Sequence, residues 1–190
     1  MTVTDEVRWR GVNHLALVTA DMDATVRFWH GVIGARLVAT IGNDSFRHYF
    51  FEVGAGSTVA FFEYRDQPLD RYAKPAGVPD RRASQFDHLS LDLADEDALL
   101  RLRARLKEHG SEVTDVVDHS VMRSIYFTDP NGIALEASWW VVDPTGRPSD
   151  YGDDRVFHDR DPVPAVRELA EQGRLERTVA THLVDEPTDL

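Results

Sequence analysis

Residues 11–40, GVNHLALVTADMDATVRFWHGVIGARLVAT, predict a strand, a helix and a second strand, and residues 86–117, FDHLSLDLADEDALLRLRARLKEHGSEVTDVV, repeat this pattern. Apolar residues recur at helical spacing in both middle segments, at Met22, Val26, Trp29 and Ile33 and at Leu99, Leu102 and Leu106. Gly34 and Gly110 follow the two segments, where a helix commonly ends in a left-handed residue. The chain therefore contains two similar repeats.

Each repeat continues with two further strand-like runs. These are RHYFFEV (47–53) and TVAFFEY (58–64) in the first copy and SIYFTD (124–129) and IALEASWW (133–140) in the second. Three landmarks keep a similar spacing between the copies: 74 residues from His14 to His88, 76 from Gly34 to Gly110 and 73 from Glu63 to Glu136. We predict an α+β fold of two tandem βαβββ modules that form a curved mixed sheet around a cleft.

The composition of the segments predicts the domain boundaries. We expect one domain over residues 10–140, with module 1 at about 10–66, a linker at about 67–85 and module 2 at about 86–140. The linker is rich in proline, glycine and charge. Residues 141–190 form a C-terminal extension that we expect to be partly ordered, with a short helix from Pro164 to near Gly173.

Charge and cysteine content narrow the possible partners. A net charge of -12 disfavours binding to nucleic acids and to anionic membrane surfaces, so a small molecule is the expected partner. The chain has no cysteine, so a bound metal must have nitrogen and oxygen ligands. Because we find neither an N-terminal signal nor an apolar run long enough to span a membrane, we expect a cytoplasmic protein.

Strand alternation places polar residues on particular faces of the predicted sheets. His14 and His88 lie opposite the leucines that should pack on the helices, Glu63 shares a face with Phe61, and Glu136 shares a face with Ser138. Burying an unpaired carboxylate costs several kcal/mol unless a cation neutralises it. Two histidines and two glutamates therefore suggest a divalent metal such as iron, manganese, nickel, cobalt or zinc.

Four stretches carry a family resemblance: NHLAL with His14, FFEY with Glu63, DHLSLDL with His88 and IALEASWW with Glu136. Over roughly residues 10–140 the chain resembles the vicinal oxygen chelate superfamily, which includes glyoxalase I, bleomycin-resistance proteins and extradiol dioxygenases. The resemblance implies that His14, His88 and Glu136, together with Glu63, are metal ligands. It also implies a homodimer.

Residues 117–136, VDHSVMRSIYFTDPNGIALE, are similar to the extradiol ring-cleavage pattern. In that pattern a histidine, an apolar-Tyr pair and an acidic-Pro-x-Gly turn precede the metal-binding glutamate. The resemblance implies that His119 and Tyr126 hold the substrate or dioxygen and assist proton transfer, while His88 and Glu136 bind Fe(II). Our first hypothesis is therefore an extradiol-type dioxygenase acting on a catechol-like substrate.

Two alternatives remain open at this point. Glu63 occupies a place where glyoxalase I-like enzymes have a metal ligand, so a His-Glu-His-Glu site would suit a metal-dependent isomerase or epimerase. In that reading Glu63 or Glu136 takes a proton next to a carbonyl. A third reading is a non-catalytic protein that binds a small molecule, such as an antibiotic, in the cleft, similar to the bleomycin-resistance proteins.

Overall fold

The computed structural model describes residues 11–67, 69–70, 72–79 and 86–176. Residue 10, parts of the predicted linker (68, 71 and 80–85) and the end of the predicted extension (177–190) lie outside the described residues. The chain separates into two compact units, Met1–Val141 and Val142–Leu190.

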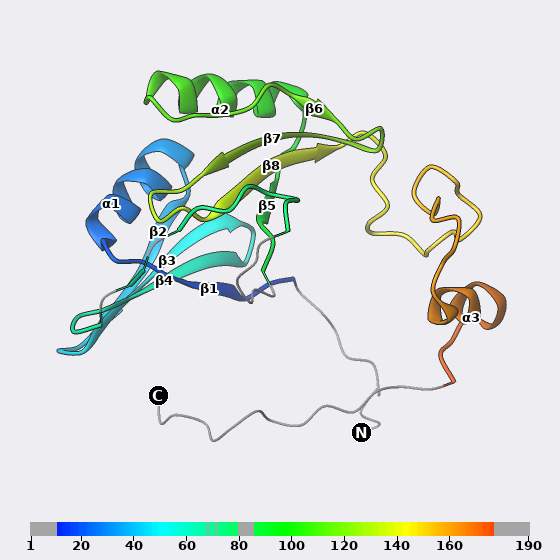
Figure 1. Ribbon diagram of the computed structural model, residues 1–190, viewed down its shortest axis with the longest axis horizontal. Coiled ribbons are helices and arrows are strands. Elements are labelled where there is room, and N and C mark those ends of the chain that lie inside the picture. Colours follow the sequence, from blue (N-terminus) through cyan, green and yellow to red (C-terminus); the bar gives the residue numbers. More distant parts are fainter. Residues whose placement is uncertain (1–10, 68, 71, 80–85, 177–190) are drawn as a thin grey trace. The chain divides into compact units, whose positions relative to one another are not determined.

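Module 1 contains two helical segments and a four-stranded sheet (Figure 1). Its elements are β1 (His14–Val18), α1 (Met22–Val26), a π-helical segment η1 (Arg27–Ile33), β2 (Arg36–Gly42), β3 (Phe46–Gly54) and β4 (Ser57–Tyr64). The strand order is β1-β4-β3-β2. β1 runs parallel to β4, and the other pairs are antiparallel.

Module 2 repeats this topology. Its elements are β5 (Leu89–Asp92), α2 (Glu96–Glu108), β6 (Val117–Asp118), β7 (Met122–Thr128) and β8 (Ala134–Trp140). The strand order is β5-β8-β7-β6, with β5 parallel to β8. The prediction of an α+β fold with two tandem βαβββ modules is confirmed.

The two helices begin and end in the same way. The side chains of Asp21 and Asp95 each accept a hydrogen bond from a backbone N–H in the first turn, which stabilises the start of the helix. Gly34 and Gly110 have φ values of 86° and 78°, the left-handed conformation that glycine adopts without steric cost. The prediction of one regular helix in module 1 was wrong, because its second half is the π-helical η1, which still buries Trp29.

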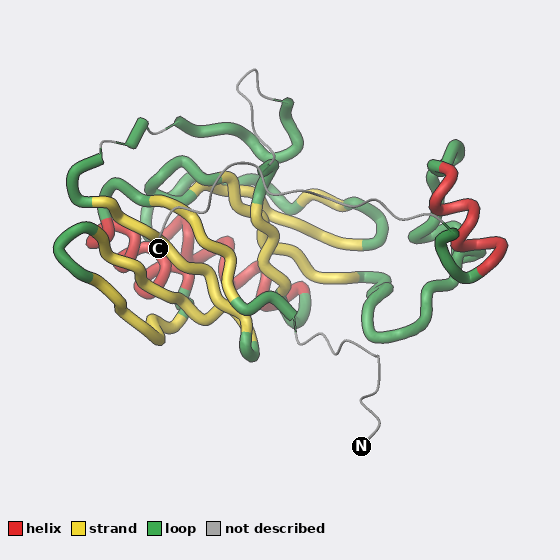
Figure 2. The backbone as a smooth tube through the Cα atoms, turned by 90° about the horizontal axis from the view of Figure 1, so that it is seen from below, coloured by secondary structure: helices red, strands yellow, loops and turns green. Residues whose placement is uncertain are grey.

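One hydrophobic core joins both modules, because the helix-facing sides of the two sheets contribute to the same cluster. Figure 2 shows the helices of this unit behind its strands. Its largest fully buried side chains are Trp29, Phe51 and Phe61 from module 1 and Leu99, Leu106, Ile125 and Leu135 from module 2. Burying one such side chain contributes about 1.5–3 kcal/mol. The stability of either module therefore depends on the other.

The turn between β7 and β8 adds a buried polar connection between the modules. Asp129 and Asn131 are 4% and 6% exposed. Asp129 accepts a hydrogen bond from the Trp29 indole at 3.4 Å, and the Asn131 carbonyl oxygen accepts one from the Thr19 hydroxyl at 2.6 Å. At Gly132 an added Cβ would lie 2.7 Å from the Tyr72 carbonyl oxygen, so the linker crosses this turn at close range.

Over residues 142–176, the described part of the second unit, the chain forms one helix, α3 (Pro164–Gln172), which begins with Pro164 and ends at the left-handed Gly173. Tyr151 and Phe157 are in ring contact beside it, with centroids 5.0 Å apart. Within the described part of this unit, residues 142–176, no side chain is fully buried. Among the described helices of the whole chain, none is long and apolar enough to cross a membrane.

Candidate metal centre

His88 and Glu136 meet on one face of the module 2 sheet. His88 directly precedes β5, and β5 pairs with β8 so that Ser90 lies opposite Glu136. The Nε2 atom of His88 lies 2.9 Å from Oε2 of Glu136. The Glu136 side chain is only 6% exposed, so a carboxylate is held in a largely dry position against an imidazole.

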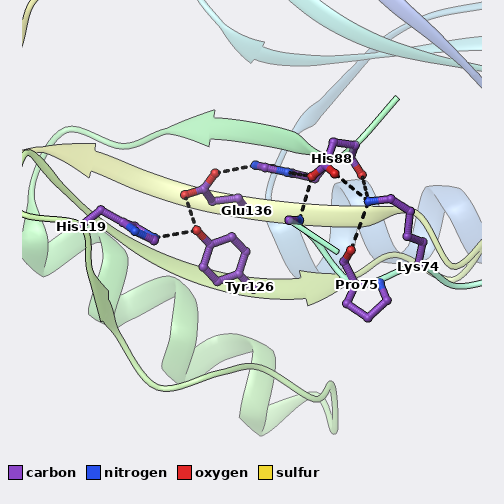
Figure 3. Close-up of polar contacts among 8 residues, drawn as sticks. Lys74, Pro75, His88, His119, Tyr126 and Glu136 are labelled. Carbon is purple, nitrogen blue, oxygen red and sulfur yellow. Dashed lines mark hydrogen bonds and ion pairs between the residues drawn. The ribbon is translucent and has the colours of Figure 1, made fainter. Parts of the chain in front are cut away.

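Tyr126 and His119 extend this contact along the same face (Figure 3). Tyr126 lies opposite Glu136 in the β7–β8 register, and its hydroxyl donates to Oε1 of Glu136 at 3.1 Å. The Nε2 atom of His119 lies 2.7 Å from the same hydroxyl. Four polar side chains thus form a continuous chain, His119–Tyr126–Glu136–His88.

A tight turn after β6 aims His119 at Tyr126. Ser120 has a φ of 69°, which is uncommon for a residue other than glycine. Its backbone N–H donates to the Asp118 side chain at 2.7 Å, and the His119 N–H donates to the Met122 carbonyl at 2.9 Å. These bonds stabilise the turn. They also fix the position of the His119 backbone, from which the side chain extends toward Tyr126.

The chain of contacts changes the acidity of its members. Burial disfavours ionisation of Glu136, but hydrogen bonds from neighbours that include His88 and Tyr126 outweigh it, so its pKa lies below the ordinary value. Burial lowers the pKa of His88, but hydrogen bonds to Asp87 and Glu136 more than compensate and raise it overall. Burial and the Glu136 charge raise the pKa of Tyr126. Glu136 is therefore an anion that attracts cations, and the Tyr126 hydroxyl keeps its proton.

Behind His88 stand two residues that the sequence analysis did not single out. Oδ1 of Asp87 lies 2.5 Å from Nδ1 of His88 and accepts the Gly77 N–H at 2.8 Å. The Lys74 ammonium donates to Oδ2 of Asp87 at 2.8 Å and to the Pro75 carbonyl at 3.1 Å. Hydrogen bonds from Lys74, His88 and Gly77 keep the pKa of Asp87 far below its usual range.

His14, a predicted ligand, belongs to a different cluster. Its Nδ1 lies 2.7 Å from the Asn13 side-chain oxygen, and its ring contacts Phe50 and His48 on the module 1 sheet. Among the described residues, no three histidine, aspartate or glutamate side chains are grouped so that they could hold a metal. One copy of the chain thus brings together His88 and Glu136, with Tyr126 and His119, but not His14.

Glu63 shares a face with the fully buried Phe61, as predicted, but this is the helix-facing side of the sheet and not the side that carries His14. Glu63 accepts the Met22 backbone N–H at the start of α1 at 3.1 Å and forms an ion pair with Arg47. The assumption that Glu63 and Glu136 occupy equivalent repeat positions was wrong. Ala16 pairs with Ala60 where Ser90 pairs with Glu136, so the counterpart of Glu136 is Ala60.

The donors in module 2 fit a divalent cation as a partial site. An imidazole nitrogen and a buried carboxylate 2.9 Å apart are ligands that iron, manganese, cobalt and zinc all accept. Such sites need at least three protein ligands, so one more donor has to come from outside this pair. His14 is the predicted ligand that remains, because Glu63 is already paired with Arg47.

A signal for the missed Asp87 is present in the sequence. Each predicted histidine ligand follows a residue with a side-chain oxygen, Asn13 in the first copy and Asp87 in the second. In both copies that oxygen contacts Nδ1 of the histidine. Lys74 had no comparable signal, because the path of a linker depends on tertiary contacts.

Comparisons with known proteins agree with this fold. The family model "Glyoxalase/Bleomycin resistance protein/Dioxygenase superfamily" matches residues 11–137. "Glutathione transferase FosA" from Serratia marcescens is 27% identical over 127 residues, covering 67% of this chain and 79% of that protein.

Solved structures give the same result. A glyoxylase/bleomycin resistance protein/dioxygenase domain from Frankia sp. EAN1pec is similar with a TM-score of 0.60 and 22% identity, over 70% of this chain and 99% of that one. The fosfomycin resistance protein FosX from Listeria monocytogenes, solved with Mn(II), is similar with a TM-score of 0.50 and 20% identity, over 68% and 92% of the chains. The chain belongs to the Glyoxalase/Bleomycin resistance protein/Dioxygenase superfamily.

Proposed function

We propose that this protein is a divalent-metal-dependent enzyme that cleaves the ring of a catechol-like substrate next to its two hydroxyl groups. Both atoms of one dioxygen molecule enter the substrate, the bond between a hydroxyl-bearing carbon and its neighbour breaks, and the substrate is oxidised as dioxygen is reduced. His88, Glu136 and His14 are the proposed ligands, and Fe(II) is the favoured metal. His119 and Tyr126 are the proposed proton-handling residues.

The hydrogen-bonded chain from His119 to His88 carries this proposal. All four of its members come from one side of the module 2 sheet, and three of them, His119, Tyr126 and Glu136, belong to the stretch similar to the extradiol pattern. A ligand pair that adjoins a tyrosine and a histidine suits a substrate that must lose protons from its hydroxyl groups. The Arg47 partner of Glu63 weakens the isomerase alternative, which needs Glu63 as a ligand.

The residues at the site would have separate roles in the reaction. When bound, a divalent metal would supply a Lewis acid that lowers the pKa of the substrate hydroxyls. Because Nε2 of His119 donates to the Tyr126 hydroxyl, Nδ1 is the nitrogen of His119 that accepts a proton from the substrate side. Tyr126 keeps its own proton at neutral pH and holds His119 and Glu136 in register.

We infer that a second copy of the chain supplies His14. Within one copy His14 lies in the cluster with Phe50 and His48, apart from the His88–Glu136 pair. The face of β1 that carries His14 is open, because His14, Ala16 and Val18 are all exposed. In a symmetric dimer each His14 can complete the site of the partner.

Oxygen uptake tests the reaction. The purified protein is loaded anaerobically with Fe(II) and then mixed with aerated buffer and a panel of catechols. We expect oxygen consumption and a yellow ring-cleavage product, both lost in H88A and retained in H109A, a change at the exposed end of α2. Full activity in H88A would overturn the proposal.

Mixing two inactive variants tests the shared site. H14A and E136Q homodimers should each be inactive, whereas subunit exchange creates one intact site in each mixed dimer. We therefore expect activity to return on mixing. Mixtures that remain inactive, although mass spectrometry detects the mixed dimer, would contradict a ligand from the second copy.

The match to FosA favours a second candidate. That relative is named for glutathione transfer, a reaction other than ring cleavage. The same His88–Glu136 pair could hold a metal that activates an electrophile toward a thiol. Metal-dependent consumption of glutathione with a small electrophile, without oxygen uptake, would favour this candidate over the dioxygenase.

A further inference from the structure

We propose that Asp87, held by Lys74 of the linker, is a positioning residue that fixes the ring and the tautomer of His88, so that Nε2 faces the metal. This inference rests on the proposed metal site and adds two residues to it. It also makes the linker part of that site.

The geometry around Asp87 supports a fixed, ionised carboxylate. Its two oxygens contact three donors: the Lys74 ammonium at 2.8 Å, the Gly77 N–H at 2.8 Å and Nδ1 of His88 at 2.5 Å. An acceptor at this distance requires the proton of His88 to sit on Nδ1. The Nε2 lone pair is then free for a metal once the proton shared with Glu136 has left.

Lys74 is placed to hold the carboxylate in position. Its side chain is only 11% exposed and has three acceptors: the Asp87 carboxylate, the Asp87 backbone carbonyl at 3.2 Å and the Pro75 carbonyl at 3.1 Å. A lysine with all three ammonium hydrogens engaged has little freedom to move. Figure 3 shows Lys74 and Pro75 next to His88, on the side away from His119.

The first module repeats the arrangement in a neutral form. Asn13 directly precedes His14, and its side-chain oxygen lies 2.7 Å from Nδ1 of that histidine. Both predicted histidine ligands therefore have Nδ1 occupied by the preceding residue. Metal-bound histidines commonly donate their other N–H to a carboxylate or carbonyl, and loss of that acceptor costs about 10–100-fold in metal affinity.

Metal titration tests the proposal on the full-length protein. Co(II) is the probe, because its visible absorption reports both affinity and ligand geometry. We expect D87A, which removes the acceptor, to bind Co(II) about 10–100-fold more weakly, K74M to be weakened less, and K74R to recover much of the affinity. K107M and D44A are the matched controls, because Lys107 and Asp44 are exposed, and they should bind like wild type.

Nitrogen NMR of the metal-free protein gives a second readout. With ¹⁵N-labelled histidine, wild-type His88 should have a protonated Nδ1 in slow exchange, and D87A should lose this signal while its melting temperature stays close to that of wild type. An unchanged His88 signal in D87A would overturn the positioning role.

The two proposals fail in different ways. If wild type binds Co(II) and H88A does not, but D87A binds like wild type, the positioning role is wrong and the metal site stands. If H88A binds Co(II) as tightly as wild type, the metal site is wrong, and the NMR result alone then decides whether Asp87 fixes the ring.

Discussion

The two sheets of this protein share a topology and differ in the chemistry of the face that points away from the helices. At equivalent register positions the first sheet carries Ala60 and Phe50 where the second carries Glu136 and Tyr126. The first sheet has an aromatic face on which His48 stacks on Phe62 with ring centroids 3.6 Å apart. The two modules thus share a scaffold, and only the second carries a buried carboxylate at this register position.

The sharpest test of this difference is to give the second sheet the residue of the first. E136A replaces the carboxylate by the alanine found at position 60, and we expect metal affinity to fall by more than about a hundredfold, because a ligand is lost rather than its support. Isothermal titration with Mn(II) measures this. Wild-type affinity in E136A would mean that module 2 is not the metal site.

The shared core predicts that matched truncations in the two modules have similar effects. M22A and L106A each remove a side chain from the same core cluster, so each should cost about 2–5 kcal/mol in the free energy of unfolding. Urea denaturation followed by tryptophan fluorescence should give one transition in both variants. Two separate transitions would contradict a single core.

The tyrosine of the second sheet can also be replaced by its first-sheet counterpart. Y126F removes the hydroxyl that joins His119 to Glu136, and we expect kcat to fall by about a hundredfold, because His119 loses the group that positions it for proton transfer. Metal affinity should stay close to wild type. A parallel loss of metal affinity would assign Tyr126 to metal binding instead.

The smallest effect concerns His48 on the aromatic face. Its Nε2 is buried and has no hydrogen-bond partner among the described residues, and burial together with the nearby His14 lowers its pKa. Replacing it in H48F should stabilise the protein by about 1 kcal/mol. Thermal melts measure this gain.

The gain in H48F should depend on pH. Because the folded pKa of His48 is below the unfolded value, the unfolded state binds its proton first, and wild type loses stability as pH falls below about 6.5. The advantage of H48F should therefore be larger at pH 5 than at pH 8. An equal advantage at both values would mean that His48 does not titrate on unfolding.

Strand periodicity predicted much of the fold, and it placed two members of the candidate metal centre on one face. Alternation placed His88 opposite the core-facing leucines, and the structure puts it against Glu136. The same reasoning failed for Glu63, because the true offset between the last strands is 76 residues, from Ala60 to Glu136, and not 73. Successive side chains of a strand point to opposite faces. An offset that is wrong by an odd number of residues therefore assigns every side chain of that strand to the wrong face.

Two other features could not be derived from local patterns. Alternation says which face His14 occupies, but whether the faces of the two modules meet within one chain depends on how the helices pack into the shared core. The contact between Lys74 and Asp87 depends on the path of the linker across module 2. Both are tertiary properties without a short-range signature.

The buried turn at Asp129 and Asn131 changes how mutations in this region should be interpreted. These residues belong to the stretch that resembles a ring-cleavage signature, yet their side chains bond to Trp29, Thr19 and Thr25 of the other module. Loss of activity in an N131A variant would therefore indicate first that the protein is misfolded, and not that a catalytic group has been removed. A signature motif can persist in a duplicated protein because it fastens the two halves together.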